Sequence, residues 1–492
     1  MHFAKILSVA TLPMFLFACG DSNPSSVPVD TGKDNPVEQP GDNNLKPNTP
    51  DSLLKPIDRD SVFSNIWKGD GSAENPYLVS SEQELVSLRF YVNDSAMAFK
   101  DKFFKQTADI ALTAAWSPVG VKGTIDRPFS GHYDGASKTI SGLTINDTTA
   151  YSGLFGIVRG AQFSNVVLKD VKMTVGSYAG ALIGKADTVT VENCTIENAV
   201  VSGTDRVGGL VGEATKLSVK SVVVSGAVTG TNNVGGVIGS VQNAVMSDLT
   251  NSASVTGKSA VGGIVGTSAN VGEVGTISMA LNHGAVTGTT NVGGIVAKLS
   301  NTKLEKAGNY GAVTADESES ERPMGAVGGV VADASNNSSI NEVFNVATVT
   351  VNKNVAVGGI AGKIKGIEIA NAFNHGEVTG PASYIGGLVG NIDLEATVKS
   401  AYNKGKVPDD NVSGAVAGNM NSASTVTNVY YDKTVAGSCL VVAKTMNSEL
   451  PTGVSTEEMK AAAFITQLGS AEGVWTIDAT KFDGYPSFAW AK

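Results

Sequence analysis

The side chains of this 492-residue sequence that could take part in catalysis or metal binding are its histidines, its cysteines and its clustered charged residues. A zinc protease requires the helical motif H-E-x-x-H, whose two histidines bind the metal while the glutamate acts as the base. None of the four histidines, His2, His132, His283 and His375, lies in that motif. His283 and His375 stand at equivalent places in LNHG and FNHG, as turn residues of a repeat would. The sequence therefore predicts no metal site and no cofactor.

Two loose groups of charge are the candidates for catalysis on a polymer. One contains Asp205, Arg206 and Lys216, and the other contains Lys169 and Asp170. A lyase would need carboxylates that hold Ca²⁺ at a uronate and a lysine or arginine base, and a hydrolase would need two carboxylates across a cleft. We interpret both groups as solvated surface charge and expect no catalytic residue.

The three cysteines, Cys19, Cys194 and Cys439, do not form a disulfide framework. No C-x-x-C spacing occurs, so zinc and thioredoxin-like chemistry lack their usual motif. We expect Cys194 and Cys439 to be buried free thiols, although a disulfide between them stays open.

The composition favours a protein made of short strands and excludes a nucleic-acid partner. The net charge is −10, whereas phosphate binding requires fields of lysine and arginine. Glycine occurs 57 times and aromatic residues make up 6% of the chain. Valine is common, and its branched side chain favours strands.

The N-terminal sequence is typical of a signal that directs a protein to the cell envelope. Lys5 precedes an apolar run from Ile6 to Phe17, which is too short to cross a membrane. The residues that follow, Ala18 and Cys19, complete a stretch that resembles the lipobox of bacterial lipoproteins. The resemblance implies cleavage before Cys19 and lipidation of its thiol; the alternative is a plain secreted protein. Residues 20–60 hold seven of the sixteen prolines and predict a disordered tether.

A repeat fills the middle of the chain. Steps of a small residue and glycine, or of two glycines, recur at gaps of 27 to 35 residues, and each unit carries about three short apolar runs separated by turn residues. The spacing predicts a right-handed parallel β-helix, in which each unit is one coil and stacking closes the core. The second residues of these ten steps are the expected structural glycines: Gly153, Gly180, Gly209, Gly236, Gly263, Gly294, Gly329, Gly359, Gly387 and Gly414.

The units resemble the GLUG repeat, whose G-L-x-G signature stands here as GGLVG at 208–212 and 386–390 and as GGIVG at 262–266. The segments at 69–88 and 103–146 resemble the strand, capping helix and leading coils of such domains, and DGYPSFAW at 483–490 resembles their closing segment. The resemblance implies a pectin-lyase-like β-helix. GLUG repeats occur in bacterial surface and adhesin-like proteins, and beside a metalloprotease domain in IgA-cleaving enzymes.

These observations predict five segments: a signal peptide at 1–18, a lipidated cysteine and tether at 19–60, an N-terminal cap with leading coils at 61–150, the repeats at 151–432 and a C-terminal cap at 433–492. In the cap, a capping box of Ser455 and Glu458 predicts one short helix that ends at Gly469. Its aromatic residues are expected to cover the end of the solenoid.

We predict a monomeric lipoprotein, surface-exposed on the outer membrane, whose only membrane contact is its lipid. Its expected role is non-enzymatic adhesion to a host surface or binding of an extracellular polysaccharide. The alternative, implied by the resemblance to the pectin-lyase-like fold, is a polysaccharide lyase or another carbohydrate-active enzyme. A structural spacer that binds nothing is the third possibility.

Overall fold

The computed structural model describes residues 62–316, 325–352 and 355–491. The chain divides into two compact units, 1–57 and 58–492, and every described residue belongs to the second. The predicted signal peptide, Cys19 and nearly all of the tether lie in the first unit, outside the described residues.

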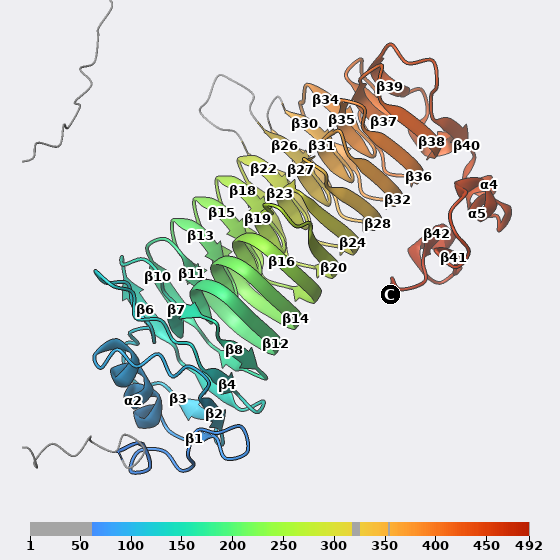
Figure 1. The fold of residues 1–492 in the computed structure, drawn as a ribbon. Helices are drawn as coiled ribbons and strands as arrows, with labels where there is room; N and C mark the ends of the chain where they lie inside the picture. The colour runs from blue at the N-terminus through green and yellow to red at the C-terminus, as the bar shows by residue number, and fades with distance from the viewer. Residues whose placement is uncertain (1–61, 317–324, 353–354, 492) are drawn as a thin grey trace, which may run out of the picture. The chain divides into compact units, whose positions relative to one another are not determined.

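The described unit is a parallel β-solenoid of about 13 turns (Figure 1), which confirms the predicted class. Forty strands form one continuous sheet, in which each strand pairs in parallel with its counterpart in an adjacent coil. Ten coils were expected from the glycine steps. The stack has more because the segment before Gly153, which lacks the double-glycine step, already pairs as β1, β2 and β4.

The strands fall into three groups along the chain. The leading strands are β1 (Tyr77–Val79), β2 (Phe103–Gln106), β3 (Ile110–Ala111), β4 (His132–Asp134), β5 (Thr139–Ser141), β6 (Thr144–Asp147), β7 (Phe155–Arg159), β8 (Gln162–Ser164), β9 (Val167–Lys169) and β10 (Lys172–Val175). Three long strands follow, each preceded by a short one: β11 (Ala179–Gly180), β12 (Ile183–Ser202), β13 (Asp205–Gly208), β14 (Val211–Thr229), β15 (Asn232–Gly235) and β16 (Ile238–Asn251).

The later coils carry shorter strands in a recurring order. They are β17 (Ser254–Thr256), β18 (Ser259–Gly262), β19 (Val265–Ala269), β20 (Gly275–Asn282), β21 (Val286–Gly288), β22 (Thr290–Gly293), β23 (Val296–Ser300), β24 (Thr302–Asn309), β25 (Val313–Ala315), β26 (Ala326–Gly328), β27 (Val331–Ser335), β28 (Ser339–Asn345), β29 (Val349–Val351), β30 (Ala356–Gly358), β31 (Ala361–Lys365), β32 (Glu368–Asn374), β33 (Val378–Thr379), β34 (Tyr384–Gly386), β35 (Val389–Asp393), β36 (Thr397–Asn403), β37 (Ser413–Met420), β38 (Thr425–Asp432), β39 (Leu440–Thr445) and β40 (Thr452–Val454).

Alternation along each strand builds the core. One side chain in two points inward and stacks on its counterpart in the next coil. The column Val207, Val234, Val261, Val292 and Val327 is an example, and all five are fully buried. A coil has no other coil to pack against except its two neighbours, so stability accumulates coil by coil.

A second column inside the solenoid is polar. The side-chain amides of six buried asparagines form a ladder: Asn251, Asn282, Asn309, Asn345, Asn374 and Asn403. Within this asparagine ladder, each Nδ2 donates to Oδ1 of the next asparagine at 2.8–2.9 Å. Each side chain also bonds the backbone N–H and C=O two residues ahead, which fixes the turn that follows. Because every amide is paired, the ladder can stay in the core.

The double glycine makes room for this ladder. A Cβ on Gly236 would lie 2.1 Å from the carbonyl oxygen of Gly263 and 2.5 Å from Cγ of Asn251. The same two contacts recur at Gly263, Gly294, Gly329, Gly359 and Gly387. The ten predicted glycines do not form one column, however. Gly153, Gly180 and Gly414 pair in register with the first glycine of the double step.

A helix and an aromatic cluster close the N-terminal end. Helix α2 (Glu82–Asn93) begins at Ser81, whose side chain accepts from the backbone N–H of Glu84, and it buries Leu85 and Leu88. The rings of Phe63 and Trp67 pack 5.9 Å apart beneath it. The predicted capping helix is therefore present.

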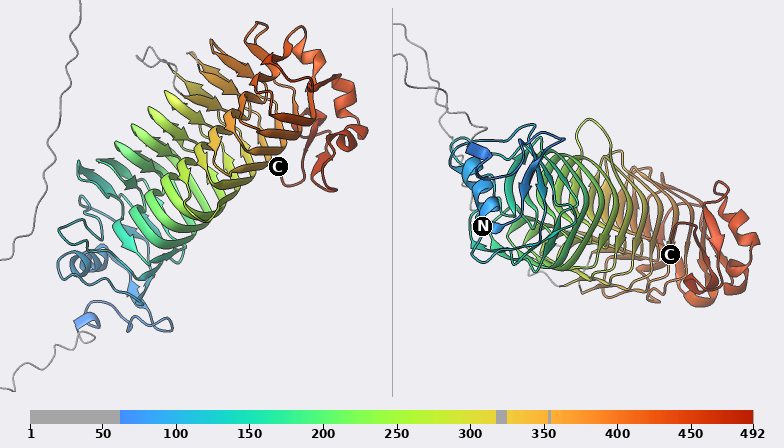
Figure 2. Two further views of the ribbon diagram at one scale, coloured as in Figure 1. Left: turned by 45° about the horizontal axis from the view of Figure 1, so that its top comes forward. Right: turned by 90° about the horizontal axis from the view of Figure 1, so that it is seen from below.

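The C-terminal segment lies along the side of the last coils (Figures 1 and 2). It comprises α3 (Lys433–Ala436), α4 (Thr456–Lys460), α5 (Ala463–Leu468), η1 (Phe482–Gly484) and the antiparallel pair β41 (Trp475–Ile477) and β42 (Pro486–Phe488). Its aromatic residues cover an outward column of stacked rings, Phe344, Phe373 and Tyr402, with centroids 5.1 and 5.5 Å apart and planes within 7°. The sequence predicted that the aromatic residues of the C-terminal segment cover the end of the solenoid. It did not predict the column of rings on the side of the solenoid that they also cover.

The predicted single helix at 455–469 is two helices. The capping box of Ser455 and Glu458 is formed, and Gly469 ends α5 in the left-handed conformation, as expected. Ala461 adopts an extended conformation between them. Met459 and Phe464 are five residues apart and would point about 140° apart on one helix. The break allows both to be buried in the same cluster.

Candidate functional site

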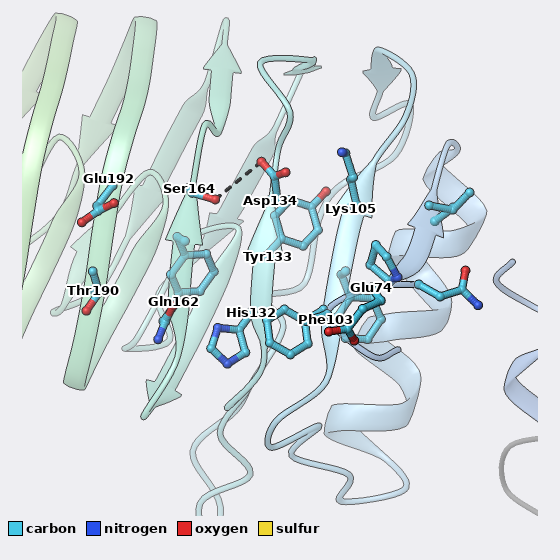
Figure 3. A pocket seen from close by; sticks show the side chains of 16 residues that line it. Glu74, Phe103, Lys105, His132, Tyr133, Asp134, Gln162, Ser164, Thr190 and Glu192 are labelled. Atoms are coloured by element: carbon cyan, nitrogen blue, oxygen red, sulfur yellow. Dashed lines mark hydrogen bonds between the residues drawn. The ribbon is translucent and has the colours of Figure 1, made fainter. Parts of the chain in front are cut away.

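A hollow with both apolar and ionisable walls lies on the outer surface of the leading coils. This cleft, cleft 1, has a volume of about 550 Å³. Two rows of outward side chains form it, and each row takes one residue from each of β2, β4, β8 and β12 (Figure 3). The first row is Phe103, His132, Gln162 and Thr190, and the second row is Lys105, Asp134, Ser164 and Glu192.

Strand register brings these residues together. β2 reads F-F-K and β4 reads H-Y-D, and Phe103 pairs with His132 while Lys105 pairs with Asp134. The middle residue of each tripeptide points into the core, which turns its two neighbours outward. The rings of Phe103 and His132 stack 4.2 Å apart with their planes within 8°.

The second row is fixed in part by hydrogen bonds. Oδ1 of Asp134 accepts from the backbone N–H of Ala136 at 2.9 Å and from Nδ2 of Asn165 at 2.8 Å. Ser164 Oγ also donates to it at 3.5 Å. Beneath the row, burial raises the pKa of Tyr133, whose hydroxyl donates to Gln106. A buried, neutral tyrosine thus lies beneath a surface that mixes apolar rings with hydrogen-bonding groups.

The repeat marker did not predict cleft 1. Strands β2 and β4 precede Gly153, where the marker first occurs, so they could not be aligned by it. The available signal was the pair of tripeptides F-F-K and H-Y-D, each an apolar residue between two that can point outward.

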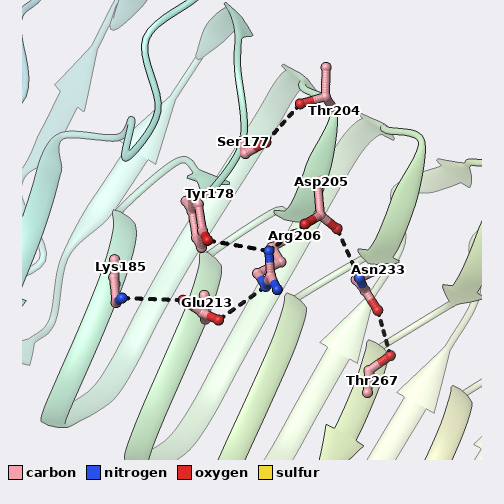
Figure 4. Close-up of polar contacts among 9 residues, drawn as sticks. All are labelled: Ser177, Tyr178, Lys185, Thr204, Asp205, Arg206, Glu213, Asn233 and Thr267. Atoms are coloured by element: carbon pink, nitrogen blue, oxygen red, sulfur yellow. Dashed lines mark hydrogen bonds and ion pairs between the residues drawn. The ribbon is translucent and has the colours of Figure 1, made fainter. Parts of the chain in front are cut away.

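The structure separates the predicted charge group of Asp205, Arg206 and Lys216. Arg206 contacts Asp205 and lies 3.0 Å from Oε1 of Glu213, and its guanidinium lies 5.0 Å from the ring centre of Tyr178 (Figure 4). Lys185 approaches the other oxygen of Glu213 at 3.6 Å. These charges neutralise one another across adjacent coils, so the cluster clamps coils together and presents no free base.

The other predicted residues also lie apart. Lys216 lines a separate hollow, and Asp170 accepts a hydrogen bond from Asn198 at 2.6 Å. Cys194 and Cys439 are buried free thiols, as predicted. Burial raises the pKa of Cys194 to about 12 and that of Cys439 to about 11, so neither is a reactive thiolate.

His283 and His375 follow the asparagine ladder in equivalent turns, as predicted. His283 stacks on Tyr310 at 4.8 Å. His375 lies beneath the C-terminal segment, with Nε2 2.9 Å from Oη of Tyr402, which donates to the carbonyl oxygen of Pro486. Burial, with a smaller effect of Lys404, holds the pKa of His375 well below its usual value.

Among the described residues, no group of three or more His, Cys, Asp or Glu side chains could hold a metal ion. Within the same residues, no helix is both long enough and apolar enough to cross a membrane.

Comparison with known proteins gives partial similarity only. No family model matches the sequence. Over 168 residues, 32% of this chain, it is 30% identical to halomucin of Haloquadratum walsbyi. Over 148 residues, 27% of this chain, it is 31% identical to a protein of Evansella cellulosilytica provisionally named a Gly-rich membrane protein. The chain spans 2% and 16% of the lengths of these two relatives.

Two solved structures align with most of this chain. One, from Bacteroides ovatus and provisionally named an immunoglobulin A1 protease, covers 87% of this chain and 96% of its own at 17% identity. The other, named IgA1 Protease, covers 80% of this chain and 24% of its own at 14% identity. Both alignments have a TM-score of 0.33.

Proposed function

We propose that this chain is a surface lipoprotein that binds an extracellular polysaccharide, or a surface rich in one, without cleaving it. Cleft 1 is the observation that carries the proposal. A sugar ring has apolar C–H faces and a rim of hydroxyl groups. The Phe103 and His132 rings beside Lys105, Asp134 and Gln162 supply the matching combination of apolar contact and hydrogen bonds.

The envelope location is part of the same proposal. Ala18 and Cys19 supply the cleavage and lipidation site, and the segment up to residue 60 supplies the tether. The name of the Evansella relative, which refers to a membrane, agrees with this location. We further propose that the coils are GLUG repeats and that the protein acts as a monomer. Many weak contacts along repeated coils would then add through multivalency.

The test is a retention assay with product analysis. Residues 19–492 carrying Cys19→Ser, and therefore free of lipid, are incubated with insoluble plant, microbial and host polysaccharides. We expect retention on at least one polymer, and at least a tenfold loss of affinity for Phe103→Ala. Phe90→Ala is the matched control, because Phe90 lies on α2, is 51% exposed and does not line cleft 1. Equal retention of both variants would refute the role of cleft 1, and no retention of the parent would favour a spacer or a protein partner.

An enzyme is the second candidate, because cleft 1 also holds ionisable groups. Lys105, Asp134 and Glu192 share the second row and could supply a base and carboxylates. New reducing or unsaturated ends in the same incubation would establish cleavage. Their loss in Glu192→Gln, with retention unchanged, would assign the chemistry to this row.

A further inference from the structure

Cleft 1 continues into a second hollow. The second hollow, cleft 2, has a volume of about 910 Å³ and shares Thr190 with cleft 1. The residues that line cleft 2 include Lys216, Ser218, Asn243, Val245 and Val271. The shared residue shows that the two hollows meet on one surface of the solenoid.

Register shows that the first row runs through both. Thr190 pairs with Ser218, and Ser218 pairs with Val245, so the row reads Phe103, His132, Gln162, Thr190, Ser218 and Val245 on successive coils. Neighbouring strands lie about 4.8 Å apart, so the five steps span about 24 Å. A hollow of this length parallel to the solenoid axis matches an extended chain of about five sugar rings better than a single ring.

An inserted turn bounds the far end. Val245 follows Val241 by four positions, whereas their partners in the next coil, Ser268 and Thr276, are eight positions apart. The extra residues form the turn that carries Val271. Its backbone N–H donates to Oδ1 of Asn243 at 3.0 Å, which holds the turn against cleft 2. Val271 is 72% exposed and Val245 is 62% exposed, so this end offers apolar contact, as Phe103 does at the other.

The charge of the joined surface restricts the ligand. Two lysines, Lys105 and Lys216, face four carboxylates, which are Glu74, Asp134, Glu192 and Glu273, for a net charge of −2. A negative surface repels a polyanion. Hydroxyl-rich, uncharged chains incur no such cost.

We propose that clefts 1 and 2 form one trough that binds a single linear, uncharged polysaccharide chain lying parallel to the solenoid axis. This inference rests on the proposed function and deepens it, because it fixes the charge, the minimum length and the orientation of the ligand. Acidic polysaccharides are excluded as the preferred ligand.

The experiment measures binding of oligosaccharides by calorimetry to residues 19–492 carrying Cys19→Ser. The probes are dimers and hexamers of β-1,4-glucan, β-1,3-glucan, β-1,4-mannan and β-1,4-xylan, with hexagalacturonate as the acidic counterpart. We expect at least one neutral hexamer to bind at least tenfold more tightly than its dimer and than hexagalacturonate. Val245→Asn should weaken the hexamer about fivefold or more and leave the dimer unchanged. Val223→Asn is the matched control, since Val223 is 45% exposed on β14 and lines neither cleft.

The outcomes separate the trough from the proposed function. A hexamer that binds no better than its dimer, or an unaffected Val245→Asn, would overturn the trough while binding itself stands. Tightest binding of hexagalacturonate would overturn the assignment of an uncharged ligand. No binding of any probe, together with no retention on any polysaccharide, would overturn both.

Discussion

Replacing Asn309 by alanine tests the asparagine ladder directly. Its side chain is fully buried and makes four hydrogen bonds. Nδ2 donates to Gly311 O and Asn345 Oδ1, while Oδ1 accepts from Gly311 N–H and Asn282 Nδ2. At about 1 kcal/mol net for each of these four bonds, we expect Asn309→Ala to lower the free energy of unfolding by about 4 kcal/mol.

Urea denaturation followed by circular dichroism measures this loss. The control is Asn352→Ala, because Asn352 is exposed and makes one side-chain hydrogen bond of 3.2 Å to Asp316. An exposed substitution of this kind changes stability by about 0.5 kcal/mol or less. Hydrogen exchange should also speed up most in the coils that contain Asn282, Asn309 and Asn345, because coils contact only their neighbours. Equal midpoints for Asn309→Ala and Asn352→Ala would refute the claim that the ladder stabilises the core.

Three further predictions concern a glycine, a histidine and the anchor. Gly236→Val should lower the thermal midpoint, because its Cβ would lie 2.1 Å from a carbonyl oxygen. Gly272→Asn should lower it much less, because the Cβ would meet open space and asparagine tolerates a φ of +82° better than most residues. An unchanged melting curve for Gly236→Val would contradict the packing assignment. Because the folded state holds the pKa of His375 below the 6.5 of the unfolded chain, protons bind the unfolded state preferentially, and stability should fall as pH drops below about 6.5, by at most about 1.4 kcal/mol per pH unit. Urea midpoints read by tryptophan fluorescence should show this loss reduced in His375→Gln and retained in His283→Gln; identical pH profiles would contradict it. Cys19→Ser should abolish labelling by a palmitate analogue and release the protein from membranes, and labelling that persists would exclude Cys19 as the anchor.

The glycine spacing was sufficient to predict the solenoid, because stacking demands that each coil present the same corner at the same interval. The reason for the second glycine was not predicted, although N-x-G recurs at Asn282, Asn309, Asn374 and Asn403. To connect N-x-G with the double-glycine step, one must know that the asparagine side chain lies against the second glycine inside the solenoid. Gly236 and Asn251 are 15 residues apart in the sequence, and only the closure of the coil brings them into contact.

Cleft 1 and the position of the C-terminal segment depend on contacts that no local pattern encodes. Phe103 and His132 belong to different coils, in strands without the repeat marker, and Lys105 meets Asp134 only through their register. The outward rings of Phe344, Phe373 and Tyr402 stand in strands whose pattern resembles that of the other coils. Their burial depends on a segment much further along the chain, which closes over them through the contact of Tyr402 with Pro486.

The matching register of successive coils has an evolutionary consequence. Asp205 pairs with Asn232, and Asn232 pairs with Ser259. Equivalent positions in these successive coils are therefore separated by the same number of residues, 27. Excision of the segment 205–231 would join Thr204 to Asn232 and leave each remaining strand facing a partner of the same kind. Unequal recombination between such segments can therefore lengthen or shorten the gene by whole coils without a new packing solution. The length of the solenoid is therefore a quantity that selection can adjust in steps of about 4.8 Å.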